Sequence, residues 1–162
     1  MKVSITRNNE TKSAELSGIK TTQLGETVTS YGDWTFNVTL GTPNIAASGG
    51  SSTITISRPI RKVILNTGDE VEETATTGTF TVSSSVNSFT VENTDTTNGV
   101  MSSSVEPKYK VSVEGAGATA ADAISSTIKV VFTSTNPTTG TTAAQVSKTI
   151  TRVASVLSNT KY

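Results

Sequence analysis

A glycine pair followed by strict alternation constrains the fold of this chain more than any other feature. Gly49-Gly50 precedes the run Thr53-Ile54-Thr55-Ile56-Ser57, in which polar and apolar residues alternate. Glycine adopts positive φ without steric cost, so the pair predicts a reversal of the backbone. A period of two places the isoleucines on one face of a strand, and we expect that face to lie in a core. These features predict an antiparallel β domain.

The same alternation recurs along the chain between turn-forming residues. Its clearest instance is 34–40, where Trp34, Phe36, Val38 and Leu40 share one face. Further strands are predicted at residues 61–66, 79–83, 88–92, 108–114, 127–133 and 144–153. We expect 79–83 and 88–92 to pair as a hairpin, 93–106 to form a long loop and 118–123 to form one turn of helix. About seven or more short strands at this spacing predict a sandwich.

Composition divides the chain into three segments. Residues 1–33 are polar and poor in apolar side chains, so they are predicted to form an arm or an edge hairpin. Residues 34–154 are predicted to form the sandwich, and residues 155–162 a C-terminal tail. The length of 162 residues suits one domain with a small appendage.

The residue types that are missing exclude several kinds of chemistry. The sequence has no cysteine and no histidine, which removes disulfides, thiolates, the commonest metal ligand and the commonest general base. Its 13 basic and 13 acidic residues give a formal net charge of zero. That balance argues against a nucleic-acid partner and against attachment to an anionic membrane. We expect no cofactor, no metal and no enzymatic activity.

One dense acidic cluster, residues 68–73, is a candidate site. Asp69, Glu70, Glu72 and Glu73 supply the oxygen ligands that calcium prefers, but their spacing does not match an EF-hand loop. A glycosidase would need a carboxylic acid of raised pKa in an enclosing cleft. The sequence offers no aromatic platform to hold a sugar there. We interpret the cluster as a solvated turn, and these four carboxylates are the first to substitute if an activity is found.

A small basic group surrounds a proline. Arg58, Arg61 and Lys62 flank Pro59 and can dock on an acidic patch of a partner, because arginine offers a bidentate fork. The alternative is an edge strand whose charges prevent unwanted pairing. For Trp34, the alternation with its apolar neighbours favours core packing over a role as an interface anchor.

The N-terminal arm is the second candidate for protein interaction. The alternating run that contains Lys2, Val3, Ile5 and Arg7 predicts a short strand. Such a strand can add to the open sheet edge of a neighbouring molecule, with main-chain hydrogen bonds supplying affinity. The alternative is that the arm folds back on its own domain.

Three motifs are informative together: Asn44-Ile45-Ala46-Ala47-Ser48-Gly49-Gly50, Thr53-Ile54-Thr55-Ile56 and the final strand Lys148-Thr149-Ile150-Thr151-Arg152-Val153-Ala154. Through these motifs, residues 34–154 resemble the bacterial immunoglobulin-like domains of the Bacteroidetes type, including the BACON group. The resemblance implies an all-β, immunoglobulin-like antiparallel sandwich carrying an extended arm. Many BACON domains have a tryptophan after the second strand, where this chain has Arg58-Pro59-Ile60-Arg61.

Similar domains occur in surface proteins of gut bacteria and in virion proteins of their phages, including crAss-like phages. The resemblance implies a structural virion protein, an auxiliary capsid (decoration or cement) protein present in multiple copies. Its partners would be the major capsid protein or other virion proteins, on the capsid surface. No apolar run follows Lys2, so we expect synthesis in the host cytoplasm without a signal peptide. The alternative is a glycan- or host-surface-binding module of a phage fibre or a bacterial surface protein.

Overall fold

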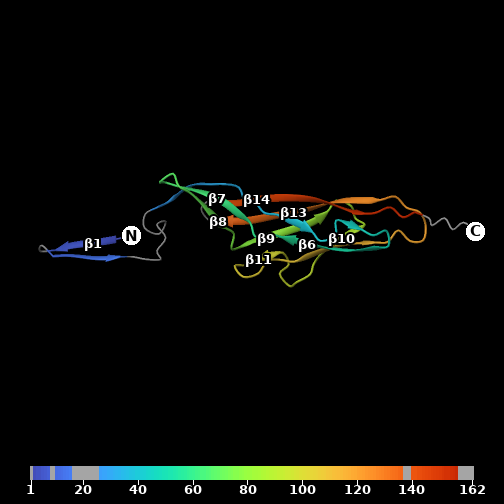
Figure 1. Ribbon diagram of the computed structural model, residues 1–162, viewed down its shortest axis with the longest axis horizontal. Coiled ribbons are helices and arrows are strands. Elements are labelled where there is room, and N and C mark those ends of the chain that lie inside the picture. The colour runs from blue at the N-terminus through green and yellow to red at the C-terminus, as the bar shows by residue number, and fades with distance from the viewer. Residues whose placement is uncertain (1, 8–9, 16–25, 137–139, 157–162) are drawn as a thin grey trace, which may run out of the picture.

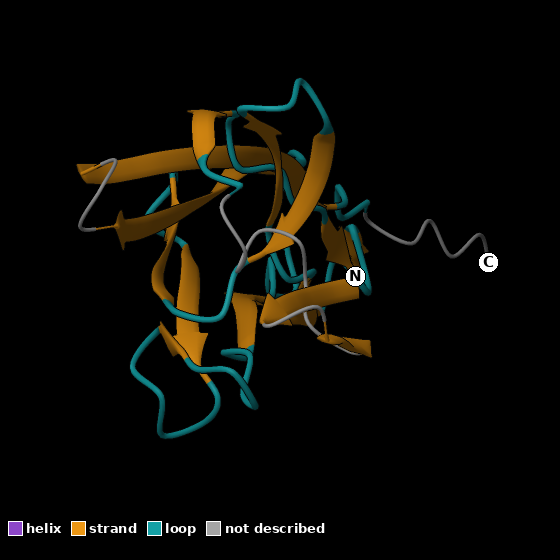
Figure 2. Ribbon diagram, turned by 90° about the vertical axis from the view of Figure 1, so that its left-hand side faces the viewer, coloured by secondary structure: helices purple, strands orange, loops and turns teal. Residues whose placement is uncertain are grey.

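The computed structural model describes residues 2–7, 10–15, 26–136 and 140–156, and these residues form strands, turns and loops without a helix (Figures 1 and 2). The strands are β1 (Lys2–Arg7), β2 (Glu10–Glu15), β3 (Val28–Tyr31), β4 (Val38–Leu40), β5 (Asn44–Ile45), β6 (Gly49–Ile56), β7 (Ile60–Leu65), β8 (Glu70–Thr74), β9 (Gly78–Ser84), β10 (Phe89–Asn93), β11 (Val100–Met101), β12 (Tyr109–Glu114), β13 (Ile124–Asn136) and β14 (Gly140–Arg152).

Two sheets packed face to face form the body of the molecule. One has the strand order β10-β12-β6-β4, and the other has the order β11-β9-β13-β14-β5. The strand pairs in these sheets are antiparallel except β14 with β5, which is parallel. A three-stranded sheet, β3-β7-β8, and the separate β1–β2 hairpin complete the described structure. The predicted all-β sandwich is confirmed, and its immunoglobulin-like character stays a prediction.

The core contains the apolar residues that alternate along the strands. Ile54 and Ile56 on β6 are buried, while Thr53 and Thr55 between them are exposed, as predicted. Burying one such face in each sheet removes apolar area from water, which stabilises the fold by roughly 25 cal/mol per Å². The two faces therefore adhere although the polar faces stay solvated.

Four aromatic rings connect the sheets at the centre of the core. Phe132 on β13 is fully buried, and its ring centroid lies 5.0 Å from that of Phe80 and 5.8 Å from that of Trp34. Phe36 meets the Phe80 ring edge-on at 5.8 Å. Such pairs add about 0.5–1.5 kcal/mol each beyond the area they bury. Core packing of Trp34, which the alternation favoured, is therefore what the structure shows.

The glycine pair forms the predicted turn. Gly49 has φ 86°, and its N–H donates to the Ala46 carbonyl at 2.9 Å. A Cβ placed on Gly49 would lie 2.8 Å from the Val113 carbonyl oxygen. Only glycine therefore allows β6 to begin so close to β12.

The predicted hairpin between 79–83 and 88–92 is wrong. β9 pairs with β13, and β10 pairs with β12 in the opposite sheet. In the connection from β9 to β10, the N–H of Ser85 donates to the Thr127 carbonyl at 3.0 Å, and the N–H of Val86 donates to Ser126 Oγ at 3.2 Å. These bonds hold the connection on β13 while it crosses from one sheet to the other, so it does not close as a tight turn.

The remaining connections also differ in detail from the prediction. The segment 118–123 forms no helical turn. Within it, Ala121 forms an isolated β-bridge with Ser155 through two backbone hydrogen bonds of 2.9 and 3.0 Å. The segment 93–106 is interrupted by the two-residue strand β11. Within the predicted arm, β3 pairs with β7, and only β1–β2 stands apart. Of the predicted tail, residues 157–162 lie outside the described residues.

Gly78 provides a test of core packing. It has φ 151°, and a Cβ there would overlap the ring of Phe132. We expect Gly78→Ala to lower the free energy of unfolding by about 3 kcal/mol through overpacking. Gly68→Ala is the control, because its Cβ would enter open space and only the positive φ costs energy, about 1 kcal/mol. Urea unfolding measures both, and equal losses would contradict the packing argument.

Candidate interaction surface

The N-terminal candidates lie on a hairpin that pairs with no other described strand. β1 and β2 run antiparallel in continuous register from Lys2↔Glu15 to Arg7↔Glu10. Val3 and Ile5 are therefore on the same six-residue strand as the two basic residues, as the alternation predicted. Figure 1 shows this hairpin beyond one end of the body.

A hairpin of this size depends on further contacts. Two strands alone are at best marginally stable in water, and independent stability needs a third strand or a packing surface. Both outer edges of the β1–β2 sheet lack a strand partner in the described structure. A strand added at either edge would therefore stabilise the hairpin.

Arg61 is buried inside the molecule and is not available for docking. Its side chain is 1% exposed, and its Nε donates to Glu73 Oε2 at 2.8 Å. The guanidinium lies 4.2 Å from the ring centroid of Tyr31 and 4.3 Å from that of Trp34, so it is held between two aromatic faces. The predicted docking role of Arg61 is wrong, because its guanidinium is buried and contacts a carboxylate and two rings of its own chain.

The alternative interpretation of this basic group, a charged edge strand, is also wrong. β7 pairs with β3 on one side and with β8 on the other, so it is the central strand of its sheet. Lys62 is the exposed member of the group, with a side chain 62% exposed, and its Nζ lies 3.4 Å from Glu70. An exposed pair of this kind contributes little to stability.

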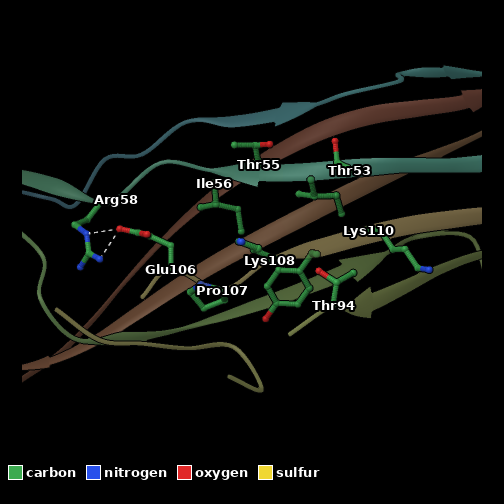
Figure 3. Close-up of a pocket in the computed structure, with 11 residues that line it drawn as sticks. Thr53, Thr55, Ile56, Arg58, Thr94, Glu106, Pro107, Lys108 and Lys110 are labelled. Atoms are coloured by element: carbon green, nitrogen blue, oxygen red, sulfur yellow. Dashed lines mark hydrogen bonds and ion pairs between the residues drawn. The ribbon is translucent and has the colours of Figure 1, made fainter. Parts of the chain in front are cut away.

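Arg58 ties together three segments that are distant in sequence. Its Nη1 donates to the carbonyls of Ala75 at 3.0 Å and Ser102 at 2.9 Å, and its Nε donates to Glu106 Oε1 at 2.9 Å. Figure 3 shows this ion pair at one end of a groove. The N–H groups through which Arg58 was predicted to bind a partner are therefore already bonded within the chain.

The groove results from a split between β6 and the segment before β12. It has a volume of about 530 Å³. The two strands pair only as far as Ile54↔Tyr109, and beyond that point Pro107 has no N–H to donate to Ile56. The lining residues are Thr53, Ile54, Thr55, Ile56, Arg58, Thr94, Glu106, Pro107, Lys108, Tyr109 and Lys110.

The groove contains little reactive chemistry. Its only lining carboxylate is Glu106, which is paired with Arg58. Its aromatic residue, Tyr109, is buried and donates its hydroxyl to the Phe80 carbonyl at 3.2 Å. Burial raises the pKa of Tyr109, with a smaller contribution from the charge of Asp95. This arrangement gives neither an acid–base pair nor a ring on which a sugar can stack.

Asp95 organises the loop that borders the groove. Its carboxylate accepts hydrogen bonds from the hydroxyl of Thr97 at 2.6 Å, from the N–H of Thr97 at 3.0 Å and from the N–H of Lys108 at 2.9 Å. The bonds from Thr97 chiefly lower the pKa of Asp95 from 3.8 to about 2. The predicted loop is therefore held by a carboxylate that sequence reasoning did not single out; its only signal was the turn-forming run around it.

The acidic cluster spans a turn and an edge strand. The Asp69 carbonyl accepts from the N–H of Leu65 at 2.9 Å, and its carboxylate accepts from Thr67 Oγ1 at 3.0 Å. Glu70, Glu72 and Glu73 follow on β8, which has β7 on one side and no strand on the other. Sequence reasoning identified these carboxylates but missed the open edge, because pairing partners are set by the tertiary fold. Across the described ranges, no three metal-ligating side chains gather into a group that can hold a metal ion.

Comparison with family models, curated proteins and solved structures finds no match to this chain. The resemblance to the BACON group therefore stays a prediction. In the part of the chain that the structure describes, no helix is long and apolar enough to cross a membrane. The class that the fold defines is an all-β sandwich with an additional sheet and a separate hairpin.

The role assigned to Arg61 predicts a large loss of stability on its removal. Arg61→Ala removes two cation–π contacts, the bond to Glu73 and the packing of the alkyl stem, so we expect a loss of about 3 kcal/mol. Lys62→Ala, one residue away on the exposed face, should change stability by no more than about 0.5 kcal/mol. Urea unfolding at neutral pH compares them, and similar values for both would contradict the internal role of Arg61.

The lowered pKa of Asp95 predicts a pH-dependent effect. A carboxylate whose pKa is lower in the folded state stabilises the fold above its unfolded value of 3.8, and this contribution is lost as pH falls towards about 2. Asp95→Asn should therefore melt below the wild type near neutral pH, and the difference should shrink between about pH 4 and 2. Thermal unfolding over this range measures it. A difference that is constant with pH would contradict the assignment.

Proposed function

We propose that this chain is a non-enzymatic structural protein of a bacteriophage particle, an auxiliary capsid protein that decorates or cements the shell. Its partners are the major capsid protein or other virion proteins, which it joins through its N-terminal hairpin and its open sheet edges. The observation that supports this most directly is the β1–β2 hairpin, which pairs with no other described strand while the body offers unpaired edges.

The chemistry of the body supports the same proposal. The buried charged groups, Arg61 and Arg152, bond to a carboxylate and to backbone carbonyls of their own chain. The groove has one carboxylate, and Arg58 neutralises it. What the surface offers is backbone edges and exposed charge. Several such small contacts, repeated by the symmetry of a particle, give avidity without any one strong interface.

The alternative, a glycan- or host-surface-binding module, is favoured by no observation in the structure. Stacking on a sugar requires an exposed ring. Tyr31 is occupied by Arg61, and among the described residues the other aromatic side chains are buried: Trp34, Phe36, Phe80, Phe89, Tyr109 and Phe132. Specific binding on a glycan array would nevertheless support this alternative over the capsid proposal.

Removing the hairpin tests the proposal. A chain lacking residues 1–25 keeps β3 and every strand of the sandwich, so it should unfold at the same denaturant concentration as the full chain. We expect it to be lost from particles, because the contacts supplied by the hairpin are gone. The measurement is its copy number per purified particle by mass spectrometry, with the full chain as control. Incorporation of both forms at equal occupancy would overturn the proposal.

A further inference from the structure

The open edges of the described sheets are not equally suited to accept a strand. β4, β5 and β11 offer two or three residues each, and β3 has an irregular register between Val28 and Ser30. β14 is long, but Lys148 stands opposite the buried Ile128, on the core side of the sheet, and is nevertheless exposed. An inward-pointing lysine at an edge discourages pairing. Of the strands that end a sheet of the body, the five-residue strands β8 and β10 remain.

The backbone of β8 presents a regular row of free groups. The bonds from Leu65 N–H to the Asp69 carbonyl and from Ala75 N–H to the Pro59 carbonyl show that odd-numbered residues bond towards β7. Glu70, Glu72 and Thr74 therefore direct their N–H and C=O groups away from β7, and the register is free of bulges. Three residues of one edge can thus form a ladder with an added strand.

The charge of this edge selects the incoming strand. β8 carries three glutamates in five residues: Glu73 pairs with Arg61, Glu70 pairs with Lys62, and Glu72 has no ion-pair partner in the described structure. β10 differs, because its one acidic residue, Glu92, is paired with Lys110. A second β8 would place carboxylates opposite carboxylates, which is destabilising. The edge therefore excludes pairing with itself and favours a basic strand.

β1 is the basic strand that this chain supplies. Its sequence, Lys-Val-Ser-Ile-Thr-Arg, has two cations and no acidic residue, and its six residues are enough to pair with the five of β8. Within the hairpin, Lys2 and Arg7 stand opposite Glu15 and Glu10 of β2. The outer edge of β1 is unpaired, and β1 does not pair with β8 of its own chain. Val71 on β8 is 39% exposed, so an added strand with alternating apolar residues would also cover it.

We propose that the outer edge of β8 receives β1 from a second copy of this chain, extending the β3-β7-β8 sheet across two molecules. Each copy has one basic donor strand and one acidic acceptor edge. Copies can therefore join in a ring or a chain, the arrangement expected of a heterologous contact. This inference rests on the proposed function only in using the hairpin as the connecting element.

Charge reversal tests the inference on the full-length protein. Glu70→Lys with Glu72→Lys makes the acceptor basic, and Lys2→Glu with Arg7→Glu makes the donor acidic. The donor variant also carries Glu10→Lys and Glu15→Lys, because these residues stand opposite Arg7 and Lys2 and the hairpin then keeps opposite charges across its strands. We expect the wild type to self-associate in a concentration-dependent way, and each charge-reversed variant to associate at least about tenfold more weakly. Sedimentation velocity measures this, and added salt should weaken the wild-type association.

Mixing the two charge-reversed variants is the decisive experiment. The basic donor of one then meets the acidic acceptor of the other, and the acidic donor meets the basic acceptor, so association should return. Glu92→Lys with Glu114→Lys is the control for the change in net charge, because it adds the same charge outside β8. This variant should associate like the wild type. The folding of each variant is checked by thermal unfolding, and Glu73 is left intact because it binds Arg61.

The outcomes separate this inference from the proposed function. A wild type that is monomeric at all concentrations, or variants that do not recover on mixing, would overturn the pairing between copies. If the chain lacking residues 1–25 is then still lost from particles, the hairpin binds a different virion protein and the proposed function stands. If instead the wild type self-associates and the chain lacking residues 1–25 is fully incorporated into particles, only the proposed function is overturned.

Discussion

The contacts of Phe132 with three other aromatic rings hold this structure together. The chain is only 33% hydrophobic and has four phenylalanines and one tryptophan, so little apolar volume is available to join two sheets. Placing Phe132 on the central strand β13 lets it meet Phe80 in its own sheet and Trp34 and Phe36 from the segment that leads into β4. Close packing at this point makes full use of that volume.

Trp34 extends this cluster to the third sheet. One contact of its ring is with Phe132, and another is with the guanidinium of Arg61 on β7. The β3-β7-β8 sheet is therefore joined to the sandwich through a cation held between aromatic faces, together with the backbone bonds between Thr35 and Ile60 at 2.8 and 2.9 Å. A buried arginine can have this role because the planar guanidinium stacks on rings while its N–H groups bond in the plane.

The side chains used inside the fold determine which groups remain at the surface for binding a partner. The large apolar rings lie inside, two of the three basic residues of the 58–62 group are used to join segments, and the groove ends in a closed ion pair. Main-chain edges and exposed charges remain on the surface. The proposed assembly role is based on these edges and charges, because it uses the hairpin and the acidic edge together.

The sequence by itself determined the strands and their buried faces, because a period of two is a local property of the backbone. Ile54, Ile56, Phe36 and Val38 could all be assigned to the core in this way, as could the turn at Gly49. For the candidate site, the sequence indicated a short basic strand at the N-terminus and a solvated acidic turn. It did not indicate that the acidic residues continue into an edge strand.

Only the tertiary structure decided which strands pair and which charges are used inside. β9 and β10 are neighbours in sequence yet belong to opposite sheets, and Arg61 is buried although its position looks like a charged edge. The reason is physical. Pairing depends on contacts between residues far apart in the chain, where the entropy of closing a loop is balanced against the area buried by the whole sheet, and no local pattern contains that balance.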